Sequence, residues 1–332
     1  MAYRRRYGSY KAKRRTKRSA RPSRSTVKTP RYRRTRRTSR PMSKKRILNV
    51  TSTKKRDDMS SWVYVANSQG TGYNTVQAPA VAAGNQTGAS ASNPRTTGYI
   101  WCPTARDFTS SSSGAKGNIS DIATRTSSTC YMRGIAERIE VQTSTGIPWQ
   151  WRRICFRYRG NLYGSNGNSQ SGAYQTHLET TNGFQRVSVQ FTDTTATGNT
   201  IENSLTNLIF RGTPGSGDWF DYMNAPLDPT RIDIAYDKQT VISSGNASGK
   251  IFRKKLWHPM NKNLVYDDDE QGGTEASTYY SMHGKQGMGD YYIVDFFKAG
   301  IGAAQVDQLS FEPQCTKNRY IDFNEHAIHL HP

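Results

Sequence analysis

The sequence predicts an all-β protein, a two-sheet sandwich or jelly roll, preceded by a disordered basic arm. Short segments rich in β-branched and aromatic residues recur from residue 98 to residue 323, between turns rich in Gly, Asn, Asp and Pro. Helical periodicity is weak and is confined to residues 196–207, where it allows a turn or two. The first 56 residues contain 24 Lys or Arg and no Asp or Glu. These three observations separate the chain into an arm, residues 1–56, and a body, residues 57–332.

The arm has too little apolar surface to offset the entropy of folding, and its like charges repel one another. It therefore reads as a disordered polycation. The body carries 23 basic residues (47 minus 24) and 25 acidic ones, a net charge of −2. The whole formal charge of +22 at pH 7 thus belongs to the arm.

A dense cationic arm is the usual footprint of binding to nucleic acid, because Lys and Arg release counterions from phosphates without reading sequence. The same clusters suit nuclear import receptors. The arm could instead be a solvated tail without a binding partner. A membrane-surface patch is disfavoured, because it would need an amphipathic helix and the arm sequence shows none. The predicted nucleic-acid-binding residues are Arg4, Arg5, Arg6, Tyr7, Lys11, Lys13, Arg14, Arg15, Lys17, Arg18, Arg31, Arg33, Arg34, Arg36, Arg37, Lys44, Lys45, Arg46, Lys54, Lys55 and Arg56.

The expected strands follow in order along the chain. A short strand at 47–51 joins arm and body, 62–65 forms a second, and 66–98 is a long polar loop. The clearest alternation lies in 130–143 and 149–159, which a Gly-Ile-Pro turn connects. Further strands are predicted at 98–101, 184–191, 205–210, 231–236, 250–257, 291–297 and 319–323.

The strand at 149–159 carries the strongest basic and aromatic cluster of the body. One interpretation is a phosphate-facing inner surface, and the other is a solvated face on which Arg stems cover aromatic rings. The cluster consists of Trp149, Trp151, Arg152, Arg153, Arg157 and Arg159. A weaker cluster of the same kind is Arg253, Lys254 and Lys255.

The remaining motifs predict no catalytic, cofactor or metal site. Residues 244–251 have the wrong glycine spacing for a phosphate-binding loop. His326, His329 and His331 lack partners at ligand spacing, and residues 267–270 lack the pattern of an EF-hand. No nucleophile-and-base motif is present, so the chain does not read as an enzyme.

Four scattered cysteines, Cys102, Cys130, Cys155 and Cys315, read as buried free thiols in a reducing compartment. No secretory signal and no run of 18 apolar residues is present. The sequence therefore predicts neither export by the usual route nor a membrane partner.

Three blocks of the chain resemble the capsid proteins of genomoviruses, small circular single-stranded DNA viruses related to geminiviruses. They are residues 43–57, SKKRILNVTSTKKRD, residues 146–156, GIPWQWRRICF, and residues 256–259, LWHP, which an acidic stretch follows. The resemblance implies an eight-stranded jelly-roll subunit, a small icosahedral shell, packaging of circular single-stranded DNA, and nuclear import by the arm. It brings no catalytic residues.

The expected function is therefore that of a structural protein of the virion, with the host nucleus as a second location. Its expected partners are copies of itself, the DNA genome and an import receptor. Sixty copies, the simplest icosahedron, would supply on the order of 1,400 arm charges against one charge per nucleotide. The alternatives are a cellular nucleic-acid-binding protein with a basic tail and, more remotely, a nuclease or ligase with a basic docking tail.

Overall fold

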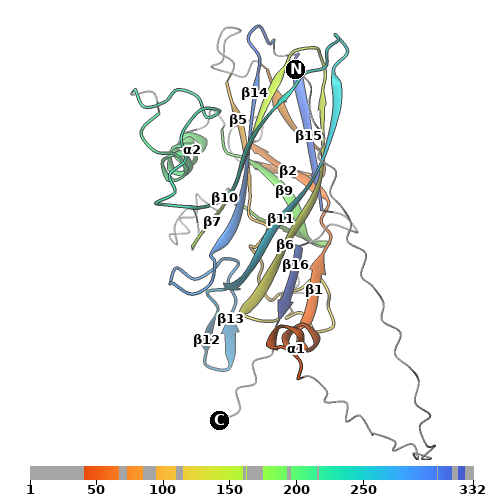
Figure 1. The fold of residues 1–332 in the computed structure, drawn as a ribbon, viewed down its shortest axis with the longest axis vertical. Coiled ribbons are helices and arrows are strands. Elements are labelled where there is room, and N and C mark those ends of the chain that lie inside the picture. The colour runs from red at the N-terminus through yellow and green to blue at the C-terminus, as the bar shows by residue number, and fades with distance from the viewer. Residues whose placement is uncertain are drawn as a thin grey trace, which may run out of the picture. The chain divides into compact units, whose positions relative to one another are not determined.

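The computed structural model describes residues 41–66, 73–84, 95–109, 115–159, 162, 175–192, 196–214, 217–304, 306–315 and 321–325. The chain divides into two units, Met1–Ser43 and Lys44–Pro332. All described helices and strands belong to the second unit, whose strands are arranged in layers (Figure 1).

The first sheet has six strands, and its centre is the long strand β6 (Thr129–Thr143). On one side β6 pairs along its first half with β16 (Ile321–Glu325) and along its second half with β15 (Gln308–Gln314). The neighbours beyond these are β1 (Thr53–Asp57) and β4 (Ala80–Ala83). On its other side β6 pairs with β11 (Lys250–Val265), so β11 forms an edge of this sheet.

The second sheet has eight strands. Its order is β10 (Asp233–Ile242), β7 (Trp149–Tyr158), β14 (Asp290–Ala299), β5 (Thr97–Trp101), β9 (Gly183–Gln190), β2 (Ser61–Ala66) and β3 (Tyr73–Val76), and β8 (Leu178–Thr180) also pairs with β9. All its pairs are antiparallel except β2 with β9. A separate hairpin joins β12 (Asp269–Gln271) to β13 (Thr274–Ala276).

Side chains from both sheets meet in a shared apolar core. The ring of Trp151 on β7 lies 6.3 Å from Phe252 on β11 and 6.2 Å from Phe311 on β15, centroid to centroid. A second cluster of buried residues contains Cys155 of β7 and Ile135 of β6. Each fully buried large apolar side chain contributes about 1.5–3 kcal/mol to folding, so the packing of the two sheets stabilises the fold. The all-β prediction with antiparallel sheets is confirmed, although short strands from the connections raise the number of strands above eight.

Two predicted strands are wrong, because those residues form helices. Residues 47–51 belong to α1 (Lys44–Thr51), and residues 205–209 end α2 (Ala196–Ile209). In α2 the residues Leu205 and Ile209 are fully buried. They stand four residues apart, which places them on one face of a helix, and the packing of this face outweighs the β propensity of the segment. None of the helices in the described ranges is long and apolar enough to cross a membrane.

The predicted boundary of the arm also moves. Residues 1–40, for which disorder was predicted, lie outside the described residues. Disorder does not hold for the last part of the predicted arm, because α1 begins at Lys44 and all five residues of β1 pair with β16. The basic residues of β1 are folded because their backbone forms β-sheet hydrogen bonds with β16. Pairing with a strand so distant in the sequence leaves no local sequence pattern. The predicted loop at 66–98 likewise contains β3, β4 and the start of β5.

Candidate nucleic-acid interface

The predicted arm residues from Arg4 to Arg37 lie outside the described residues, so their role stays a prediction. Of the next group, Lys44 and Arg46 are exposed on α1, and the side chain of Lys45 is not described. The helix contains no acidic residue, so it continues the positive charge of the residues before it. Residues 1–43 are therefore followed in the chain by a short cationic helix, α1, and then by β1.

In β1 the basic residues alternate between solvent and interior. Lys54 and Arg56 are exposed, whereas Lys55 is only 1% exposed. The Lys55 ammonium donates to the carbonyl oxygen of Asp121 at 2.8 Å and to that of Asn118 at 3.4 Å. The prediction that Lys55 contacts nucleic acid is therefore wrong, because its charge is used to hold the segment 118–121 against β1.

Four members of the predicted cluster on β7 are buried rather than exposed on a surface. Trp149 and Trp151 are each 1% exposed, and Arg152 and Arg153 are 6% and 2% exposed. Arg152 pairs with Asp237 of β10 at 2.8 Å and donates to the carbonyl oxygens of Tyr222, Met223 and Ala225. The segment 222–225 thus covers this arginine. For these four residues both sequence interpretations, the phosphate-facing surface and the solvated face, are wrong.

Arg153 points into the sandwich and belongs to a buried ionic network that spans both sheets. Its guanidinium donates to Glu137 of β6 at 2.6 Å and to both carboxylate oxygens of Asp295 of β14 at 2.7 Å. Arg186 of β9 donates to Glu137 at 3.0 Å. Two buried guanidinium groups therefore face two buried carboxylates, and buried ions are tolerated only when they are compensated in this way.

His258 of β11 completes the network, with its Nε2 3.4 Å from Glu137 Oε2 and its Nδ1 3.8 Å from Cys155 Sγ. Burial opposes protonation of His258, but Cys155 and Glu137 raise its pKa to about 9. Burial alone would raise the pKa of Glu137, yet Arg153 and Arg186 outweigh burial and hold that pKa below its ordinary value. These shifts favour the charged forms of Glu137 and His258 at neutral pH, and the network links residues of both sheets.

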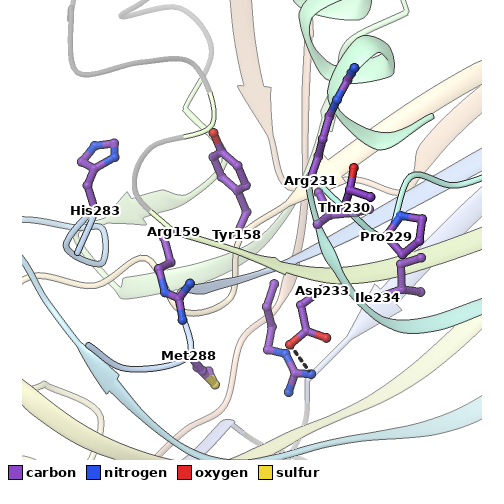
Figure 2. A pocket seen from close by; sticks show the side chains of 11 residues that line it. Tyr158, Arg159, Pro229, Thr230, Arg231, Asp233, Ile234, His283 and Met288 are labelled. Carbon is purple, nitrogen blue, oxygen red and sulfur yellow. Dashed lines mark ion pairs between the residues drawn. The ribbon is translucent and has the colours of Figure 1, made fainter. Parts of the chain in front are cut away.

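Arg157 and Arg159, at the end of β7, do reach the surface and line a pocket of about 670 Å³ with Tyr158, Arg231 and other residues (Figure 2). Arg157 pairs with Asp233 at 2.7 Å, and Arg231 pairs with Asp228 at 3.2 Å. Arg159 is exposed and donates to the carbonyl oxygen of Gly287 at 3.4 Å. Acids of the protein itself neutralise most of the pocket's positive charge, which leaves Arg159 as the cation best placed to meet an external anion.

The weaker predicted cluster on β11 divides between the two faces of its strand. Lys254 points inward, with its ammonium 4.7 Å from the centre of the Trp151 ring, and burial lowers its pKa, as do Lys238 and Arg153. Arg253 and Lys255 point outward and are exposed. Arg253 pairs with Glu140 of β6 at 2.6 Å. Only the outward members of this cluster can contact nucleic acid.

Sequence reasoning missed two residues of the same outward face, Arg138 on β6 and Trp257 on β11. Both are exposed, Trp257 to 51%. The alternation of residues 251–257 was sufficient to place Trp257 beside Lys255, since side chains two apart share a face of a strand. Arg138 could not be found in this way, because the pairing of β6 with β11 determines its position.

The minor motifs take structural positions. Residues 243–249 connect β10 to β11, in agreement with the turn favoured over a phosphate loop. Asp268 is not a solvated loop residue, because Arg125 donates to both of its carboxylate oxygens, at 2.6 and 3.0 Å. Among the described residues no group of three His, Cys, Asp or Glu could hold a metal ion, and the three terminal histidines lie outside them. The four cysteines are buried thiols that form no disulfide, as predicted.

No protein-family model and no curated protein matches the chain. The resemblance to genomovirus capsid proteins thus depends on the three sequence blocks alone.

Proposed function

We propose that the protein is a viral capsid protein, which assembles with copies of itself into a small icosahedral shell and packages circular single-stranded DNA. The observation that carries the proposal is the separation of charge along the chain. Residues 1–43 hold 18 of the 47 Lys and Arg and no acid, so residues 44–332 hold 29 basic and 25 acidic side chains. A polycation attached to a nearly neutral folded body suits a protein that neutralises phosphates with one part and packs against its own copies with the other.

The strand order supports a jelly-roll body. Four strands of the first sheet have the order β4-β15-β6-β11, and four strands of the second have the order β5-β14-β7-β10. The two sheets pack against each other. Among these eight strands the chain crosses from one sheet to the other at every connection except that from β7 to β10. Jelly rolls build viral capsid domains as well as lectins and cupins, so the fold alone does not decide between these functions. The basic arm favours the capsid.

Exposed apolar side chains on the connecting segments support contacts between copies. Phe220, in the segment between α2 and β10, is 83% exposed. Ile301 and Val306, between β14 and β15, are 80% and 75% exposed. Burial of such side chains against a neighbouring subunit would remove apolar surface from water and so favour association. A closed shell of symmetric contacts, with 60 subunits in the simplest case, would bury them repeatedly.

Clusters such as Lys11–Arg18 would also serve a nuclear import receptor, which gives the protein two locations, the virion and the host nucleus. The import role and the packaging role would both depend on the positive charge of residues 1–43. Neither role requires a cofactor or a catalytic residue.

Electron microscopy of the purified full-length protein, with absorbance at 260 and 280 nm on the same fraction, tests the proposal. The expected result is uniform closed particles whose absorbance ratio reveals bound nucleic acid. If the protein stays monomeric or dimeric over a range of salt and pH, the shell is refuted, and a cellular nucleic-acid-binding protein becomes the better assignment.

A further inference from the structure

The outward face of β11 presents an unusual set of side chains. Ile251, Arg253, Lys255 and Trp257 alternate along this edge strand and all point away from the core. Ile251 and Trp257 are 59% and 51% exposed, and the side chain of Arg253 is 74% exposed. An aromatic ring and several cations therefore share one open sheet face.

Two of the cations on this face oppose each other without a counterion. In the pairing of β11 with β6, Lys255 stands directly opposite Arg138. Both side chains are exposed, and neither makes an ion pair with any residue that the structure describes. Like charges at opposite positions of neighbouring strands destabilise a sheet. The folded body thus keeps a repulsive pair at the surface.

The nearest acids on this face are already engaged. Glu140 lies one position along the outward face of β6, where it pairs with Arg253 at 2.6 Å and accepts a hydrogen bond from Gln142 at 2.6 Å. The hydrogen bond from Arg253 lowers the pKa of Glu140, as does that from Gln142. Glu312, opposite Glu140 on β15, accepts a hydrogen bond from Gln314. The charges of Lys255 and Arg138 therefore remain available to an anion outside the chain.

Trp257 is held in place by the strand beside it. A Cβ atom on Gly134 of β6 would lie only 2.7 Å from Cζ2 and 2.9 Å from Cη2 of the Trp257 ring. The ring therefore lies against bare backbone at Gly134, where no side chain separates it from β6. Its position is fixed by packing while about half of its surface stays open, which is how a stacking platform for an unpaired base is arranged.

We propose that Trp257, Lys255 and Arg138 form a second nucleic-acid site, which binds a short stretch of single-stranded DNA. A base would stack on Trp257, and phosphates would meet Lys255 and Arg138. Lys255 and Trp257 stand two residues apart on one face, about 7 Å along the strand, so one short stretch of nucleotide chain can contact both. Duplex DNA would not suit the site, because its base faces are hidden in the stack.

The site rests on the proposed packaging function, and its place in the fold suits that function. The exposed Lys54 and Arg56 lie on β1, which belongs to the same sheet and is separated from β11 by β16 and β6. Residues 1–43 join the body at α1, which comes directly before β1 in the chain. DNA gathered by that segment would therefore meet a sheet whose far edge offers both stacking and unpaired charge.

Photocrosslinking of the full-length protein to a short poly-dT oligonucleotide that contains 5-bromouracil, followed by peptide mapping, tests the site. We expect a crosslink at Trp257 that falls on the order of tenfold in the double variant Arg138→Gln, Lys255→Gln. The slope of log affinity against log salt should also fall by about 1.4, that is about 0.7 for each of two lost phosphates on a single strand. Arg253→Gln is the matched control, since it removes a cation that Glu140 already neutralises, and its crosslink at Trp257 should be unchanged.

Three other results would overturn the site. Crosslinks confined to residues 1–56 would refute the site at Trp257 but would remain compatible with the packaging function. Equal loss in the control and in the double variant would show that general charge, not this pair, binds the oligonucleotide. If Trp257→Ala changes particle assembly but leaves the oligonucleotide affinity unchanged, the face is a contact with another copy. Failure of the packaging function itself would look different, because the full-length protein would then form no closed particles, whether or not Trp257 crosslinks to the oligonucleotide.

Discussion

Strands β7 and β11 are alike in sequence, since each places arginine or lysine beside tryptophan, but the structure uses them in opposite ways. On β7 the side chains of Arg152 and Arg153 are buried, and acids from other strands compensate them. On β11 the outward Lys255 has no acid partner among the described residues and faces another cation, Arg138. Cations of the first kind hold the fold together, whereas cations of the second kind are available to an external polyanion.

The difference arises from partners that are distant in the sequence. Glu137 and Asp295, which compensate Arg153, come from β6 and β14. On the face of Lys255, the next outward residue of β6 beyond Arg138 is Glu140, which already pairs with Arg253. Whether a basic cluster is structural or functional therefore depends on strand register, and substitutions in the two strands should have effects of opposite kinds.

The largest effect is expected from Arg153→Met. The substitution removes the guanidinium that binds both carboxylate oxygens of Asp295 and leaves this buried carboxylate with Arg186 as its ion-pair partner, 3.8 Å away. Breaking a buried ion pair typically lowers the free energy of unfolding by about 3–5 kcal/mol. Urea denaturation of the purified variant measures this loss. The exposed Arg253→Gln should change stability by less than about 0.5 kcal/mol. Equal stability of the two variants would contradict the structural role of β7.

A smaller loss should separate two adjacent lysines of β1. Lys55→Met removes the hydrogen bonds that a buried ammonium donates to Asp121 and Asn118, which should lower the free energy of unfolding by about 1.5–3 kcal/mol. Lys54→Met, one residue away and exposed, should leave stability nearly unchanged while weakening DNA binding slightly. Thermal melts of both variants check the contrast, and a Lys54 variant that melts lower than the Lys55 variant would reverse the assignment.

The ionic network should also make stability depend on pH. The pKa of His258 is raised from 6.5 to about 9, so its protonation stabilises the fold fully below pH 6.5, and this contribution is lost as pH rises through 9. The free energy of unfolding should fall across this window by at most about 1.4 kcal/mol per pH unit. His258→Gln should flatten the decline. His177→Gln should retain it, because burial lowers the pKa of His177 to about 4, outside this window.

The smallest effect should have the opposite sign. Lys255→Glu replaces a repulsive cross-strand pair with an attractive one, so it should raise the free energy of unfolding by about 0.2–1 kcal/mol. Arg253→Glu, on the same face, would oppose Glu140 and should lower it by a similar amount. Denaturation curves of the two variants give the comparison. Two losses of equal size would show that the pair is not strained.

The sequence was sufficient to predict the all-β class, because the alternation of apolar and polar residues in 130–143 and 149–159 can be read from neighbouring residues alone. It was insufficient for Leu205 and Ile209, whose short apolar run fits a strand as well as a helix until packing decides. It also misplaced Trp149, Trp151, Arg152 and Arg153. Burial of an arginine requires acids that arrive from distant strands, and such pairing leaves no local pattern.

Strand pairing also explains why the sequence predicted only part of the candidate site. Lys255 was identified from composition and lies on the surface, whereas Arg138 becomes its neighbour only through the register of β6 with β11. Lys55 shows the converse. Its basic surroundings predicted a phosphate contact, but pairing of β1 with β16 directs Lys55 inward, where its ammonium bonds backbone carbonyl groups.

The most direct test of the separation of roles is to compare single-stranded DNA binding by the full chain and by a chain that lacks residues 1–43, with fluorescence anisotropy over a range of salt. The full chain should lose about 10³-fold or more in affinity between 50 and 200 mM salt, as expected for many phosphate contacts. The shortened chain should bind weakly, with a shallow salt dependence, and should unfold at the same urea concentration. Unchanged binding by a folded, shortened chain would contradict the account, because the body would then carry the affinity assigned to the arm.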